Sequence, residues 1–151
     1  MANTQAMCTS FKGDLLQAVH NFGTAPTRAG TGADTFKGAL YFATASLGAA
    51  TTAYSATGEV TGTNYTAGGN TVTNATAPTT SGTTGYWTPS ASLAFTNVTI
   101  TTAFDTVLLY NSTQSNKAVA VFTFGSQTIT AGTFTLTMPS NDASNALIRL
   151  A

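Results

Sequence analysis

The sequence has very little charge. Lys, Arg, Asp and Glu make up 7% of its 151 residues, and five basic residues balance five acidic ones, whereas soluble proteins average about 25% charged residues. Nucleic-acid binding needs clustered Lys and Arg, and so does attraction to an anionic membrane. We therefore expect neither partner. Because a weakly charged surface favours association, the composition predicts a chain that sits within an assembly, with a weakly charged monomer as the alternative.

Cysteine and histidine are almost absent, since the chain has only Cys8 and His20. A single cysteine excludes an intrachain disulfide, and one Cys with one His cannot build a zinc cluster. No apolar run approaches the ~20 residues that span a bilayer. The N-terminus also lacks the basic and apolar regions of a secretion signal. We expect no cofactor, no metal and synthesis in a bacterial cytoplasm.

No set of residues predicts catalysis. His20 would need a nucleophile and an orienting carboxylate, and the nearest acid, Asp14, is expected off the same helix face, so a partly exposed helical His20 is the simpler expectation. The five acids lie on different predicted elements, which disfavours the carboxylate pair of a glycosidase. Asp142 in "SNDAS" favours a capped turn over a calcium loop. Cys8 is interpreted as a structural residue. The sequence therefore predicts no enzyme.

What the sequence does have is apolar residues, 42% of the chain, with nine Phe; a disordered chain is poor in both. The stretch "FKGDLLQAVHNFG" (11–23) has apolar residues near helical spacing, with Ser10 as a cap and Gly23 as a stop, and predicts the one helix. A Pro- and Gly-containing loop is expected over 24–34. Residues 1–33 would then form an N-terminal arm with a short helix.

From residue 34 onward apolar residues alternate with polar ones, which is typical of β-strands. Short strands separated by Gly, Ser, Asn and Pro turns predict one mostly β domain over 34–151, an antiparallel β-sandwich of jelly-roll-like form. The loop "STQSN" (112–116) predicts a hairpin. The expected strands are 35–44 (half-buried), 92–100, 102–111, 116–125 (buried on both faces), 132–139 and 145–151.

Tyr86 and Trp87 in "GTTGYWTP" (82–89) are the most suggestive aromatic pair. Between Gly and Pro they could form a platform for a sugar ring or for a partner surface. A core Trp at the start of a strand is an equally good interpretation. Because neighbouring residues of a strand point to opposite faces, at most one of the two is expected to be buried.

Four segments carry a family resemblance over roughly residues 34–151: "DTFKGALYFAT", "TTAYSATGEVTGTNYTAGG", "AFDTVLLYNSTQSNKAVAVFTFGS" and "GTFTLTMPSNDASNALIRLA". Their order resembles a family of small structural proteins of tailed phages and prophages. The runs Glu59–Gly69 and Asn116–Val121 are its most specific parts. The resemblance implies a protein of the virion, assembled in the host cytoplasm.

Within that family we expect a head decoration (cement) protein that binds the major capsid protein and itself, as a dimer or trimer, through non-covalent contacts. A tail, collar or fibre-base component and a carbohydrate-binding module on the virion are the alternatives. The segment Tyr54–Val72 is expected to be turn-rich β structure in which Glu59 makes a specific polar contact. The arm 1–33 would become ordered on the capsid. The interface candidates are Phe11, Leu15, Val19, Glu59, Tyr65, Tyr86 and Trp87.

Overall fold

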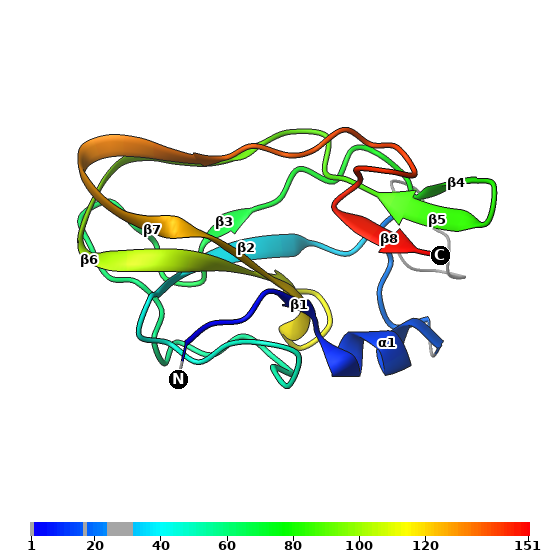
Figure 1. Ribbon diagram of the computed structural model, residues 1–151, viewed down its shortest axis with the longest axis horizontal. Helices are drawn as coiled ribbons and strands as arrows, with labels where there is room; N and C mark the ends of the chain where they lie inside the picture. The colour runs from blue at the N-terminus through cyan, green and yellow to red at the C-terminus, as the bar shows by residue number, and fades with distance from the viewer. Residues whose placement is uncertain (1, 17, 24–31) are drawn as a thin grey trace.

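The computed structural model describes residues 2–16, 18–23 and 32–151, and this part of the chain is mostly β with two antiparallel sheets (Figure 1). The larger sheet has the strand order β1-β7-β6-β2-β3 and the smaller one β4-β5-β8. The predicted β class is thus confirmed, while most of the loop expected over 24–34 lies outside the described residues. The elements are β1 Ala6–Met7, α1 Thr9–Leu16, β2 Phe36–Phe42, β3 Asn70–Thr71, β4 Thr79–Ser81, β5 Thr84–Trp87, β6 Leu93–Asn111, β7 Lys117–Leu136 and β8 Ile148–Leu150.

Two long strands dominate the larger sheet, and the sequence had predicted each of them as two short ones. β6 runs through both 92–100 and 102–111, and β7 joins 116–125 to most of 132–139. That prediction was wrong because bulges, not turns, separate the halves. The register between β6 and β7 shifts at several points, and a bulge bends a strand without ending it. The hairpin predicted at 112–116 is confirmed by the antiparallel pairing of the two strands.

The bends fold this long hairpin over on itself. In Figure 1 the beginning of β6 and the end of β7 lie above the remainder of the larger sheet. Phe134 contacts Phe104 edge to face, with ring centroids 5.2 Å apart, and its centroid lies 5.0 Å from that of Phe124. Offset and edge-on aromatic contacts of this kind stabilise a core beyond their buried area. One hairpin therefore supplies two layers of structure with aromatic packing between them.

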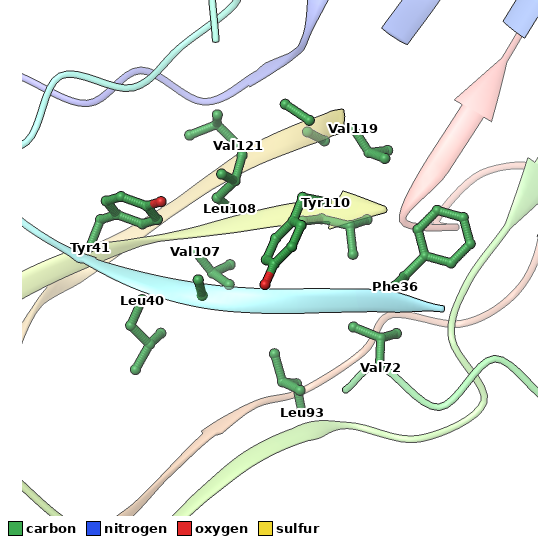
Figure 2. Close-up of a cluster of buried hydrophobic side chains, with 14 of the residues drawn as sticks. Phe36, Leu40, Tyr41, Val72, Leu93, Val107, Leu108, Tyr110, Val119 and Val121 are labelled. Atoms are coloured by element: carbon green, nitrogen blue, oxygen red, sulfur yellow. The ribbon is translucent and has the colours of Figure 1, made fainter. Parts of the chain in front are cut away.

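β2 confirms the strand predicted over 35–44, but it is buried on both faces and not half-buried. Leu40 and Tyr41 point to opposite sides of the strand, and both are fully buried (Figure 2). Leu93, from the folded-over half of the hairpin, lies on the Leu40 side. On the other side the Tyr41 hydroxyl donates to the Ser55 carbonyl at 2.6 Å, from the loop that follows β2. The strand is apolar on both faces because it lies between two covering layers.

The outer edge of β2 is covered by the turn-rich segment Tyr54–Val72. The Phe42 amide donates to the Gly58 carbonyl at 2.9 Å, and the Val60 amide donates to the Leu40 carbonyl at 3.0 Å. β3 pairs with the beginning of the same edge. Unpaired strand edges attract other strands, so this segment satisfies an edge of the chain's own sheet.

The helix α1 is shorter than predicted and begins earlier. It covers Thr9–Leu16, whereas the sequence predicted 11–23. Ser10 lies inside the helix and is therefore not its N-cap. The Thr9 amide instead donates to the Ala49 carbonyl at 2.8 Å. A backbone group from a distant loop thus satisfies one of the free donors of the first turn.

The helix ends in a Schellman motif. The Val19 amide donates to the Asp14 carbonyl at 3.0 Å, and the Ala18 amide donates to the Leu15 carbonyl at 3.1 Å. Ala18 has a φ of 52°, the left-handed conformation that this motif requires. The predicted stop at Gly23 was wrong because the helix has already ended at Leu16, seven residues earlier.

The described part of the N-terminal arm, residues 2–16, 18–23 and 32–33, is packed against the β domain. Cys8, Phe11 and Phe22 belong to the same buried cluster as the strands of the larger sheet, and β1 pairs with Ala120 and Val121, near the beginning of β7. The smaller sheet lies beside α1 in Figure 1. Its hairpin β4–β5 was not predicted, although Gly82, with a φ of 58°, marks the turn. Its third strand, β8, lies within the predicted strand 145–151.

Candidate interaction site

An apolar groove of about 270 Å³ opens between α1 and the smaller sheet. Among the residues that the structure describes, none that lines the groove is charged, and apart from the Trp87 indole its polar side chains are two threonines and one tyrosine. Such a surface favours an apolar group over an ion or a polar ligand. The lining residues are Phe11, Leu15, Phe22, Pro78, Thr79, Thr80, Gly85, Tyr86, Trp87, Ile148 and Leu150.

One wall of the groove comes from α1. Phe11 and Leu15 are four residues apart, so they lie on the same face of the helix. Phe11 is fully buried against Phe22, with ring centroids 6.0 Å apart, while Leu15 stays half-buried. Both were predicted as interface residues, and the structure places both in the same groove.

Trp87 anchors the base of the groove and cannot serve as an open platform for a sugar. Its side chain is buried against Phe22, with ring centroids 4.7 Å apart. The indole N–H donates to the Thr76 carbonyl at 2.9 Å and to Asn74 Oδ1 at 3.2 Å. Of the two interpretations left open for this residue, the core Trp is the one that the structure supports.

Tyr86 and Leu150 lie at the more accessible part of the groove. Tyr86 is half-buried, which agrees with the expectation that at most one residue of the aromatic pair is buried. Leu150 is 47% exposed and is the one exposed large hydrophobic side chain in the part of the chain that the structure describes. Leu150 was not among the predicted interface residues, although its alternation with Arg149 on the strand predicted over 145–151 was a signal.

Three predicted interface residues lie outside the groove. Val19 is half-buried directly after α1, while Glu59 and Tyr65 belong to the segment that covers β2. Glu59 makes the specific polar contact expected of it, but inside the chain, where only 6% of its surface is exposed. The structure thus brings four of the seven predicted residues together.

Glu59 organises the loop around it. Its carboxylate accepts hydrogen bonds from the Tyr54 hydroxyl at 2.6 Å, the Tyr65 hydroxyl at 2.8 Å and the Gly68 amide at 2.7 Å. The Tyr110 hydroxyl donates to the Gly68 carbonyl at 2.7 Å. Hydrogen bonds to an ionised acceptor are about twice as strong as neutral ones. One buried charge therefore holds a loop that has almost no regular secondary structure.

The tyrosines of this cluster are held in their neutral form. Burial raises the pKa of Tyr54 to about 12, and the hydrogen bond to Glu59 and its negative charge act in the same direction. Burial also raises the pKa of Tyr41, Tyr65 and Tyr110. Tyr54 and Tyr65 donate their hydroxyl hydrogens to the Glu59 carboxylate. Tyr41 and Tyr110 donate theirs to backbone carbonyls, so the cluster has a structural role.

A second buried polar cluster corrects the prediction for His20. The residue follows α1 and is buried, not a partly exposed residue of the helix. Its Nε2 lies 3.5 Å from Asp14 Oδ2, so histidine and acid are brought together after all. Asp14 Oδ1 also accepts from Lys117 Nζ at 2.9 Å. Asn111 also belongs to the cluster, since its Nδ2 lies 3.1 Å from His20 Nδ1. It was not among the predicted site residues.

Cys8 and Asp142 behave as the sequence predicted. Burial raises the pKa of the Cys8 thiol to about 11, which disfavours the reactive thiolate. Asp142 caps a turn, since its Oδ1 accepts from the amides of Ser144 and Asn145 at 2.8 Å each. Among the described residues no group of three or more His, Cys, Asp or Glu could hold a metal ion.

Comparison with known proteins found no similar protein. No family model matches the chain, no curated protein matches it, and no solved structure matches it.

Among the described residues no helix is both long enough and apolar enough to cross a bilayer.

Proposed function

We propose that this chain is a structural protein of a tailed-phage particle, in which it decorates the head and binds the major capsid protein through non-covalent contacts. The order of motifs over residues 34–151 resembles that of phage and prophage structural proteins. The low charge supports the same proposal, because a protein held in a lattice does not need the charge that keeps a free protein soluble.

The groove between α1 and the smaller sheet is the observation that carries the proposal. It is apolar and partly open, the described residues of its lining carry no charge, and one of them, Leu150, is exposed. Seating a bulky apolar side chain in such a groove contributes about 1.5–3 kcal/mol per contact. A decoration protein repeats this contact at every equivalent site of a symmetric lattice, so the particle gains a large total from a weak single contact.

We further propose that the fold is a sandwich of jelly-roll-like form and that the protein acts as a dimer or trimer. A long hairpin folded over on itself, as β6 and β7 are, is compatible with such an architecture. Symmetric oligomers of one chain are the commonest soluble assemblies, and a decoration protein of this kind would sit on a symmetry axis of the lattice.

Copy number tests the location in the particle. Quantitative mass spectrometry of purified particles should give hundreds of copies, in a fixed ratio to the major capsid protein. A dozen copies or fewer would contradict head decoration and would point to the tail, the collar or a fibre base.

A pair of variants tests the groove itself. Leu150→Glu places a charge beside the apolar groove and should reduce particle incorporation at least tenfold, because burying an unpaired charge is costly. Thr135→Glu adds the same charge at an exposed position of β7, away from the groove, and should incorporate normally. Equal incorporation of the two folded variants would contradict the assignment of the groove.

A further inference from the structure

The amide group of Asn111 has a fixed orientation at the centre of the second buried cluster. Its Oδ1 accepts hydrogen bonds from the backbone amides of Thr113 and Gln114, both at 3.1 Å. Its Nδ2 must therefore point the other way, where it donates to Asp34 Oδ2 at 2.8 Å. Turning the amide over would lose these bonds and bury unpaired polar groups.

The fixed amide determines which form of His20 the cluster accepts. Asn111 Nδ2 lies 3.1 Å from His20 Nδ1, and since the amide nitrogen is a donor, Nδ1 must be the acceptor. An acceptor nitrogen carries no proton, so the ring is neutral with its hydrogen on Nε2. Protonation would place the Nδ1–H directly against the Asn111 amide hydrogens.

The charges that face His20 do not compensate for that conflict. Asp14 from α1 lies 3.5 Å from Nε2, but its other oxygen is already paired with Lys117 from β7. Asp34, which precedes β2, accepts from Asn111. The His20 side chain is 0% exposed, and burial is the main cause of its lowered pKa. The negative charges of Asp14 and Asp34 act in the opposite direction, and the positive charge of Lys117 acts in the same direction as burial.

The same histidine supports the wall of the groove. Its ring packs on Phe11, with centroids 4.9 Å apart, and lies 6.2 Å from the ring of Phe22. Both phenylalanines line the groove. A change in the charge of His20 would therefore act directly on the packing between α1 and the smaller sheet.

We propose that His20 is a pH-sensitive latch that holds α1, and with it the groove, in place while the ring is neutral. Protonation opposes the Asn111 contact and releases the end of the helix, so the groove loosens in mildly acidic solution. The consequence for partner binding rests on the proposed function, whereas the latch is a property of the free protein.

The direction of the pH dependence follows from linkage. The unfolded chain binds a proton at His20 near the ordinary value of about 6.5, while the folded chain does so only at lower pH. Between these two values the unfolded state binds more protons, so stability falls as pH decreases. The contribution of the latch is complete above about 6.5.

Two single-copy residues make the test direct, because the chain has one histidine and one tryptophan. An NMR titration of the His20 ring protons should give a midpoint below about 6.5. The fluorescence of Trp87 should shift to longer wavelength with the same midpoint, and the amides of α1 should lose protection from hydrogen exchange. A His20 titration midpoint at or above that of a free histidine would overturn the latch. So would a low midpoint if the Trp87 emission and the hydrogen-exchange protection of α1 stayed unchanged across it.

Two variants separate the latch from general acid sensitivity. His20→Gln retains an acceptor and cannot titrate, so the loss of stability between neutral and mildly acidic pH should disappear even if the variant is less stable throughout. Asn111→Asp replaces the donor with an acceptor and should raise the His20 midpoint. If His20→Gln keeps the full pH dependence, or if Asn111→Asp leaves the midpoint unchanged, the proposal fails. Particle binding is measured separately, so a working latch without pH-dependent binding would contradict only the link to the groove.

Discussion

At the scale of single residues, three of the few charged side chains, Asp14, Asp34 and Glu59, are buried inside the protein. Glu59 is the clearest case, since its carboxylate receives two tyrosine hydroxyls and one backbone amide and is almost inaccessible. The sequence alone predicted that this lone charge makes a specific contact. It could not predict the partners, because their approach depends on how the segment folds back along β2.

Glu59→Gln should therefore destabilise the protein by about 1.5–3 kcal/mol, the usual range for hydrogen bonds to a charged group. The amide retains one acceptor oxygen but turns an NH₂ group toward donors. Chemical denaturation measures the loss. Asp142→Asn makes the same kind of exchange at an exposed turn and should change stability by less than about 0.5 kcal/mol. Equal effects of the two changes would show that the Glu59 cluster does not stabilise the fold.

At the scale of elements, the sequence predicted what depends on neighbouring residues and missed what depends on distant ones. The period-two alternation of apolar and polar residues located β2 correctly, and the loop "STQSN" located the turn at 112–116. The fusion of short strands into β6 and β7 depends on bulges formed against a partner strand, which no local pattern records. The groove is a similar case. Helical spacing and an aromatic pair identified Phe11, Leu15, Tyr86 and Trp87, but the other residues of its lining come from segments distant in the sequence, such as β8, which pairs with β5.

The end of α1 offers a test of local backbone strain. Ala18 has a left-handed conformation, with a φ of 52°, which costs a residue other than glycine roughly 1–2 kcal/mol. Ala18→Gly should raise the free energy of unfolding by about 0.5–1 kcal/mol after the extra entropy of the unfolded chain is deducted. Ala94→Gly, at an exposed position within β6, should instead lower it by about 0.5–1 kcal/mol. Changes of the same sign in thermal denaturation would contradict this account of the helix end.

The close approach of β3 to β2 gives a second test. A Cβ atom on Gly69 would overlap the Gly38 carbonyl oxygen and would lie 2.6 Å from Ala39 Cα. Gly69→Ala should therefore cost more than about 4 kcal/mol, the range of exceptional single changes, or prevent folding altogether.

Gly82→Ala is the matched control for that change. Gly82 also has a positive φ, of 58°, but no atom lies within 4 Å of the Cβ position. Its cost should be limited to backbone strain of roughly 1–2 kcal/mol. If both variants lose the same stability in urea denaturation, the contact between β3 and β2 is less tight than the structure indicates.

At the scale of the whole molecule, the formal net charge of zero shapes the expected mode of association. An interface built on an uncharged groove gains little from long-range attraction, which salt would screen. Binding of the protein to stripped particles should therefore change less than about threefold between about 50 mM and about 500 mM salt. A steep loss of binding at high salt would indicate that charged residues outside the groove make the main contact.

The pairing of β1 with β7 has a consequence for the order in which the chain can fold during synthesis. Ala6 pairs with Val121, and β2 pairs with the second half of β6, so the segments that leave the ribosome first find their partners only when most of the chain has emerged. Contacts between residues so distant in sequence form slowly, because a long loop must close first. The apolar strand β2 remains uncovered during that interval, so the nascent chain passes through a stage in which it depends on protection from aggregation.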